Sequence, residues 1–572
     1  MSFQSPVGIC RTNIPGLGTL DGLEFASGVQ QFCGIPYAHL PKRWTRSTLN
    51  IEWEGGHHDG TKMGYGCSEF MDKREHTTHH FNRNDCPSPI VDGDDSDDLV
   101  PVPPAVHFSD PRIVDELSAL VMNIVIPHAF DPKAEFLPVF VYVHGGSLLY
   151  GGANLPIFDA VNLVSHSIAI GLHIICVNFN YRVGIGGFLA GTAIADELKR
   201  DGYAGSGNFG FTDQHIAFEW IQRYIQYLGG DAQNITAVGE SAGGISISNQ
   251  LLAAKPPTFH RAVCMSGLSA AIPAWDIQQH DHLFEAVCKH FGIDPGTSEA
   301  LEQLRAIHQQ ELANATPIIQ GVPSGTGNPC LDGWFYHSGV DPRLVHPLPS
   351  WLKGYMIGDT YHEGIIFHLN LLGEDFDSVR NILHAHICDD SHTDYILKAY
   401  GIAAGLPHDE FLSRVEHMCG DAIFKIPNYL LSQKCEAQLM LEHSALYLYH
   451  FDQRSRLRNA LEGTAYHAHE LLYLFGNLSN ELNEQERNMA REFAAAWIRF
   501  SNGLAPWSAR DKSRKWMVWG PDSQMAMKDE NEDQVSRDYA RMKSILRLEE
   551  ERIFEKWMAG VDALVNRRHR PV

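Results

Sequence analysis

The chain has 572 residues, with 69 acidic and 45 basic side chains and a formal net charge of −24 at pH 7. This charge disfavours non-specific binding to nucleic acid and to anionic membrane surfaces, and the length allows a large core. No stretch is long and apolar enough to span a bilayer, and the N-terminus lacks the basic start and apolar run of a signal peptide. We therefore expect a cytoplasmic protein without nucleic-acid or membrane partners.

The predicted elements of the first half alternate between strands and helices. Val139–Val143 is an apolar run typical of a buried strand, and it ends in the sequence His-Gly-Gly-Ser at 144–147. Ile174–Asn178 predicts a second strand. From Ile216 to Leu228 apolar residues recur at helical spacing and stop at a Gly-Gly pair, which predicts an amphipathic helix. This order predicts a parallel sheet covered on both faces by helices.

Residues 234–244 contain a strand-like run, a tight turn and a run of small residues around Ser241. Ser241 lies between Gly239 and Gly243 in a Gly-x-Ser-x-Gly pattern, whose missing side chains let strand, turn and helix approach closely. Such a turn strains the serine backbone and points its Oγ at substrate, as in the nucleophile elbow of α/β-hydrolases. For the pentapeptide alone, a Gly/Ser-rich turn without function is the alternative.

Further motifs follow one another along the chain: Phe32–Ala38, Asn180–Gly184, Gly207–Gln214, Gly229–Asp231, Gly239–Gly244, Met265–Gly267, His362–Gly364, His467–Glu470 and a Trp497, Phe500 and Gly503 cluster. With them the chain resembles the type B carboxylesterase/cholinesterase family over roughly residues 15–520. The resemblance implies an α/β-hydrolase fold, with a central, mostly parallel sheet, helices on both faces and large loop and helical insertions. It implies a single domain over 1–572 that hydrolyses carboxylic esters without a cofactor. Local departures are most similar to an intracellular, fungal branch.

The resemblance also indicates the partners of the serine, which needs a base beside it and a carboxylate that orients the base. In this fold the chain order is serine, acid, histidine. Glu363 follows a strand-like run at 354–358 and stands where the family carries its acid; Asp359 is the alternative. His467 follows a second strand-like run at 445–451 and is the expected base, with His469 as the rival.

Position by position, the resemblance implies an oxyanion hole formed by the backbone N–H groups of Gly146, Ser147 and Ala242. The family loop usually has a glycine where this chain has Ser147. Serine keeps the N–H group, but its Cβ narrows the accessible backbone conformations and its hydroxyl adds a polar group. Trp275 is expected to line the acyl pocket or to lie in the core. The other residues expected around the site are Gly145, Glu240, Ser266 and His469.

The cysteines depart from the family pattern. There are 11 of them, an odd number without regular spacing, which favours a reduced compartment. Cys67 stands near the first position of a disulfide that the resemblance implies, but Ala119 aligns with the second position, and Cys86 could substitute. No tryptophan lies between Cys67 and Cys86, so we predict no site for a quaternary ammonium group.

Two clusters carry residue types that bind metals, but neither has a complete ligand spacing. They are an acidic run at 92–98 and a histidine group, and we expect both to be solvated loops without metal. Residues 534–568 alternate charged and apolar residues at helical spacing, which predicts one long amphipathic helix packed on the body. The histidine group comprises His57, His58, His76, His79 and His80.

Together these features predict a serine carboxylesterase that forms an acyl-enzyme on Ser241. The nearest alternative keeps the acyl-enzyme but passes the acyl group to an alcohol, or closes a lactone, in secondary metabolism. A second alternative is a catalytically silent adhesion or scaffold protein; it is disfavoured because Ser241, Glu363 and His467 are all retained. We expect a small-molecule ester substrate and a monomer or homodimer.

Overall fold

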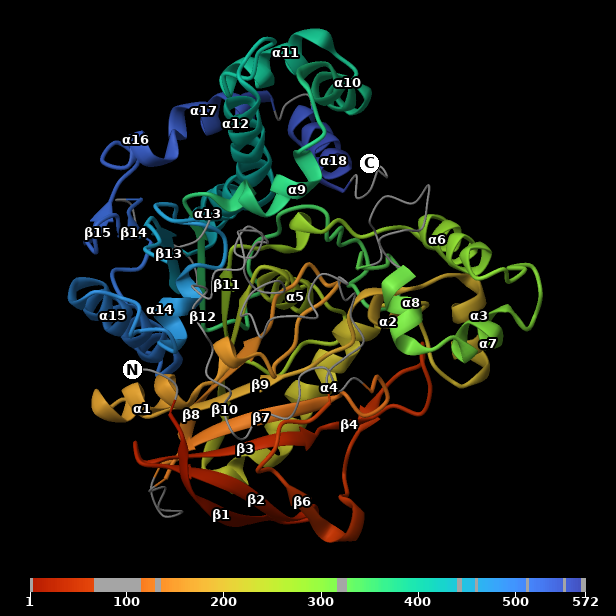
Figure 1. Ribbon diagram of the computed structural model, residues 1–572, viewed down its shortest axis with the longest axis vertical. Helices are drawn as coiled ribbons and strands as arrows, with labels where there is room; N and C mark the ends of the chain where they lie inside the picture. The colour runs from red at the N-terminus through yellow and green to blue at the C-terminus, as the bar shows by residue number, and fades with distance from the viewer. Residues whose placement is uncertain are drawn as a thin grey trace, which may run out of the picture.

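A 13-stranded sheet runs through the computed structural model, which describes residues 4–65, 115–128, 135–315, 327–439, 445–457, 461–510, 514–548 and 552–566 (Figure 1). The seven neighbouring strands β9, β8, β10, β11, β12, β13 and β14 are parallel. The strands, in their order across the sheet, are β1 (Pro6–Ile14), β2 (Gly18–Phe25), β3 (Val29–Pro36), β7 (Val121–Pro127), β9 (Ile175–Phe179), β8 (Leu137–Val143), β10 (Gly230–Glu240), β11 (Arg261–Met265), β12 (Gly354–Thr360), β13 (Ala445–Phe451), β14 (Trp516–Trp519) and β15 (Met525–Lys528), with β6 (His57–Asp59) beside β2.

Strand β8 shows why the parallel strands are continuous apolar runs in the sequence. Val139, Val141 and Val143 belong to the hydrophobic cluster on one face of the sheet, whereas Phe140 and Tyr142 belong to the cluster on the other face. Because helices cover both faces, every second residue is buried on each side and no polar alternation remains. The predicted fold, a mostly parallel central sheet between layers of helices, is confirmed.

The helices form two layers and two outlying groups (Figure 1). One face of the sheet packs against α4 (Phe209–Tyr224) and α5 (Ala242–Leu251), and the other against α1 (Val161–Ala169), α14 (Glu470–Phe475) and α15 (Glu484–Ser501). One outlying group comprises α3 (Thr192–Arg200), α6 (Ile277–His290), α7 (Ala300–Ala306) and α8 (Gln309–Ala315). The other contains α9 (His368–Leu371), α10 (Phe376–Ile387), α11 (Asp390–Ala399) and α12 (His408–Gly420); α2 (Gly184–Phe188) and α13 (Ile426–Leu439) complete the fold outside the tail.

The C-terminal segment differs from its prediction. In place of one long helix over 534–568, it forms α16 (Gln534–Arg537), α17 (Tyr539–Leu546) and α18 (Ile553–Val565). Asp538 interrupts the helix because its backbone is left-handed, with φ of 47°, and its side chain accepts a hydrogen bond from the Arg541 N–H group. Helices α17 and α18 each bury an apolar face, whereas the only buried residue of α16 is Arg537.

A buried ionic network ties this segment to the ends of β12 and β13. Arg537 is fully buried and donates to the carboxylate of Asp359 and to the carbonyl of Thr360, both at 2.9 Å. Arg537 also pairs with Asp452, and His450 Nδ1 lies 2.8 Å from Asp359 Oδ1. Burial alone would raise the pKa of Asp359, but its contacts with His450 and Arg537 lower it to about 2. The network therefore fixes the carboxyl end of β12, which Glu363 follows closely.

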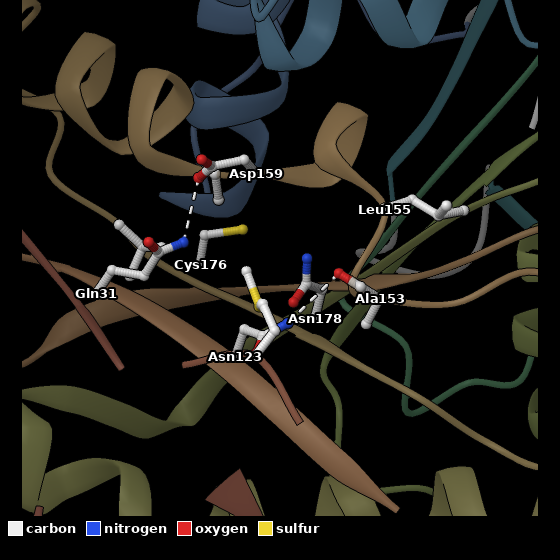
Figure 2. Close-up of a pocket in the computed structure, with 10 residues that line it drawn as sticks. Gln31, Asn123, Ala153, Leu155, Asp159, Cys176 and Asn178 are labelled. Carbon is white, nitrogen blue, oxygen red and sulfur yellow. Dashed lines mark hydrogen bonds between the residues drawn. The ribbon is translucent and has the colours of Figure 1, made fainter. Parts of the chain in front are cut away.

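A small polar cavity lies between the sheet and the segment that precedes α1, and Figure 2 shows its lining. Asp159 is buried here and accepts hydrogen bonds from Gln31 Nε2 at 3.2 Å and from the Val161 N–H group at 3.0 Å. Burial raises the pKa of Asp159 from 3.8 to about 6. Its ionised form is therefore less stable in the folded chain than in the unfolded chain.

We expect Asp159→Asn to stabilise the protein at neutral pH. The folded state keeps the Asp159 proton up to about pH 6, whereas the unfolded state loses it near pH 4, so wild-type stability falls as the pH rises between these values. Asparagine is neutral at every pH, so the variant does not lose this stability. Relative to wild type, its free energy of unfolding should be higher by up to roughly 3 kcal/mol above pH 7 and nearly unchanged near pH 4. Denaturant unfolding across this pH range measures it, with the exposed Glu52→Gln as control. A gain that is independent of pH would contradict the prediction.

Candidate active site

Ser241 lies at the predicted turn between a strand and a helix. It follows the end of β10, has φ of 53° and ψ of −124°, and directly precedes α5. A Cβ at Gly239 would lie 2.4 Å from the Gly243 carbonyl carbon, and a Cβ at Gly243 would lie 2.0 Å from the Val143 oxygen. Only glycine fits these two positions, so the glycines allow the strained turn that exposes a serine at the edge of the sheet.

Glu363 and His467 meet beside this turn. Glu363 Oε2 lies 2.5 Å from His467 Nδ1, and both side chains are buried. The other carboxylate oxygen of Glu363 accepts hydrogen bonds from Ser266 Oγ at 2.7 Å and from the Thr360 N–H group at 2.5 Å. These donors fix the carboxylate, and the carboxylate in turn fixes the orientation of the imidazole ring.

The second nitrogen of His467 points toward the residue that precedes Ser241. His467 Nε2 lies 3.1 Å from Glu240 Oε1, but it makes no aligned hydrogen bond within the described part of the chain. The His467 ring also packs 4.9 Å from the ring of Phe424. The imidazole thus has one nitrogen held by Glu363 and the other beside the turn, where it can accept a proton.

The other candidates occupy different surroundings. His469 is buried, its Nδ1 lies 3.1 Å from the Gln453 carbonyl oxygen, and burial lowers its pKa to about 3. Asp359, the alternative acid, contacts His450 and Arg537 instead of His467. Trp275 packs against the cluster of α3, α6, α7 and α8, with its ring 5.6 Å from His280, and is absent from the described lining of the pocket beside Ser241.

The loop after β8 lies against the turn. A Cβ at Gly145 would lie 3.2 Å from the Cβ of Ser241, and a Cβ at Gly146, where φ is 108°, would lie 2.2 Å from the Tyr150 oxygen. Ser147 has φ of 56°, a left-handed conformation that costs a non-glycine residue roughly 1–2 kcal/mol. Among the described residues, no hydrogen bond is donated by the N–H groups of Gly146, Ser147 or Ala242.

A pocket that is open to solvent begins at Ser241 and Ser147. Most of its other lining side chains are apolar, and the polar ones are Asn328, Asn370, Asp562 and Asn566. The lining residues are Ser147, Leu149, Ser241, Ile245, Ala271, Ile272, Gly327, Asn328, Ile366, Phe367, Asn370, Ile423, Phe424, Asp562, Val565 and Asn566.

Two parts of this pocket were not anticipated from the sequence. Ile423 and Phe424 belong to a π-helical turn over Asp421–Lys425, which no sequence pattern indicated. Asp562 and Val565 belong to α18, whose apolar spacing showed that one face is buried but not what covers it. Cys67, Cys86, His76, His79, His80 and the acidic run at 92–98 lie outside the described residues.

The described residues contain no group of three or more histidine, cysteine or acidic side chains that could hold a metal ion. Within the same ranges, no helix has the length and apolar character needed to cross a membrane. The nine cysteines that the structure describes are all free thiols.

Comparison with known proteins decides the family. The model of the Carboxylesterase family matches residues 10–548, nearly the whole chain. The chain belongs to the carboxylesterase family. As a carboxylesterase it is a carboxylic ester hydrolase, and its substrates are small-molecule esters.

Relatives of this carboxylesterase include a fungal lipase and a bacterial esterase. It is 28% identical to Lipase 3 of Yarrowia lipolytica over 487 residues, which cover 84% of this chain and 86% of the lipase. It is 27% identical to the para-nitrobenzyl esterase of Bacillus subtilis over 405 residues, covering 67% of this chain and 73% of that esterase. A solved PNB esterase structure has a TM-score of 0.68 at 22% identity and covers 93% of this chain and 99% of that one, which shows the shared fold.

Proposed function

We propose that this carboxylesterase hydrolyses its ester through an acyl-enzyme on Ser241, with His467 as the base and Glu363 as the acid. The observation that carries the proposal is the 2.5 Å contact between Glu363 Oε2 and His467 Nδ1. It leaves Nε2, the nitrogen that must accept the serine proton, on the side of the ring that faces the turn. A carboxylate that orients an imidazole beside the serine is one part of what serine hydrolysis requires.

The reaction then proceeds in two halves. The Oγ proton of Ser241 passes to His467 Nε2 as Oγ bonds to the ester carbonyl carbon, and the negative charge moves to the carbonyl oxygen. The bond to the alcohol oxygen breaks, and that oxygen takes the proton from His467. Water repeats the sequence on the acyl-enzyme, so the acid leaves and Ser241 regains its proton. Glu363 stabilises the imidazolium in each half.

The N–H groups of Gly146, Ser147 and Ala242 are the proposed donors to the developing oxyanion. Two observations support them: Gly145 lies against the Cβ of Ser241, and none of these three N–H groups has a partner among the described residues. Unused donors beside a nucleophile stabilise charge that appears only in the transition state.

An ester panel graded in acyl and alcohol size, run with an added alcohol as competing acceptor, tests the function. Hydrolysis predicts release of free acid at rates that the added alcohol barely changes. A new ester as the main product would indicate acyl transfer, and the absence of any turnover, together with no labelling by an organophosphate, would indicate a silent protein.

The cellular compartment of the protein is inferred from the state of its cysteine thiols. Nine free cysteines, eight of them buried, are what a reducing compartment favours, because an oxidising one favours disulfides. We therefore infer a cytoplasmic enzyme. Quantitative thiol titration of protein isolated under alkylating conditions tests this inference, and a disulfide would contradict it.

Two substitutions at Ser147 distinguish the role of its backbone N–H group from the role of its side chain. Ser147→Gly keeps the N–H group and suits the left-handed backbone, so we expect kcat to persist and the preference between esters to shift by up to about tenfold. Ser147→Pro removes the donor and cannot adopt φ of 56°, so kcat should fall on the order of 10²-fold or more. Steady-state kinetics on one small ester, with folding checked by thermal melt, compare the two. Equal kcat values would exclude this N–H group from the oxyanion hole.

A further inference from the structure

Helix α18 (Ile553–Val565) forms part of the wall of the pocket that also contains Ser241. The family match ends at residue 548, so this wall is contributed by residues beyond the matched part of the chain. Figure 1 shows α18 beside α10 and α9, above the parallel strands.

The helix is held firmly enough to present fixed side chains. Trp557, Val561 and Leu564 are fully buried, and the contact with α10 is close enough that a Cβ at Gly560 would lie 3.3 Å from the Leu383 Cα. On the pocket side, Asn370 Nδ2 of α9 donates to the Val565 carbonyl at 2.6 Å. This packing fixes the register of α18, and with it the residues that line the pocket.

Asp562 is the acidic side chain of this wall. Its Oδ1 accepts from Asn566 Nδ2 at 2.6 Å, and among the described residues no cationic side chain pairs with it. The apolar surroundings raise the pKa of Asp562 from 3.8 to about 7. Asp562 is half-buried, so its second oxygen can accept a hydrogen bond from water or from a molecule bound in the pocket. The pocket is where a bound substrate could provide that hydrogen bond.

We propose that Asp562 selects esters that carry a hydroxyl group on the chain, away from the ester bond, and that this hydroxyl donates to the free carboxyl oxygen. The apolar side chains between Ser241 and Asp562 bind the hydrocarbon part, and the carboxyl group binds the polar end. A hydroxyl suits the group because it can hydrogen-bond to both the neutral and the ionised carboxyl. The proposal rests on the proposed function, since it assumes that the ester reacts at Ser241.

Matched ester pairs test the proposal in two arms. One arm compares p-nitrophenyl alkanoates of graded length with their ω-hydroxy counterparts, and the other compares alkyl esters with monoesters of the corresponding diols. The arms show whether the hydroxyl belongs to the acyl or the alcohol part. In at least one arm, the ratio of kcat/KM for the hydroxylated ester to that for the plain ester should fall about threefold to tenfold in Asp562→Leu.

Two further variants sharpen the result. Asp562→Asn keeps an acceptor oxygen and should retain part of the preference. Glu555→Gln lies on the same helix, but its carboxylate is 43% exposed and pairs with Arg552, so the ratio should stay unchanged. Equal ratios in wild type and Asp562→Leu in both arms would overturn this inference while leaving ester hydrolysis intact, and so would a preference for ω-amino esters over ω-hydroxy esters. Loss of all ester turnover in the wild type would instead overturn the proposed function.

Discussion

Ser241→Ala is expected to abolish ester turnover while the protein remains folded. The substitution removes the Oγ that attacks the carbonyl carbon and leaves only binding and the oxyanion donors, so kcat should fall on the order of 10⁵-fold or more. Alanine has a Cβ like serine and leaves the packing of Gly239 and Gly243 unchanged. Kinetics on p-nitrophenyl esters measure the loss, and a thermal melt checks the fold.

Covalent labelling provides the control for this variant. An organophosphate that reacts with wild type should leave Ser241→Ala unlabelled, as read by intact mass. Ser147 and Ser266 are useful comparisons because both lie near the turn and contain a hydroxyl. A label that persists on either of them would assign the nucleophile to another residue.

His467→Ala is expected to cost as much as the serine substitution, whereas His469→Ala costs far less. His467 is the residue that transfers the proton, and members of such a unit act together, so the double variant Ser241→Ala/His467→Ala should be no worse than either alone. His469 contacts the Gln453 carbonyl and packs between Tyr466 and Tyr473, so its loss should lower stability more than kcat.

Measuring kcat and the melting temperature for both histidine variants separates the two roles. The expected pattern is an inactive, folded His467→Ala and an active, less stable His469→Ala. A reversed pattern would assign the base to His469 and place the predicted triad two residues away from its true position.

The sheet could be predicted from local sequence patterns. The same patterns predict that Ser241, Glu363 and His467 converge at the carboxyl ends of its strands. Val139–Val143 and the runs before Ser241, Glu363 and His467 are apolar, short and separated by helical segments, which is enough to predict parallel strands. Parallel strands end at the same edge, so residues that follow them converge even when they are far apart in sequence. The contact between Glu363 and His467 agrees with that expectation.

Other features depend on long-range packing and could not be predicted from local sequence patterns. Spacing shows that a helix has an apolar face, but it does not show that α18 turns Asp562 toward the pocket. The tail was predicted as one helix because the sequence gives Asp538 no strong breaker signal, yet its left-handed backbone separates α16 from α17. Glu240 is different, because the family resemblance already placed it around the site, and its Oε1 lies 3.1 Å from His467 Nε2.

The part of the pocket that α18 contributes is also the last to be synthesised. Asp562 follows Ser241 by about 320 residues, and ribosomes add about 5–20 residues per second, so roughly 16 to 64 s separate the two in a growing chain. During this interval the apolar side chains that α18 will cover remain open to water and to other proteins. The substrate pocket can therefore take its described form only after Asn566 has been added.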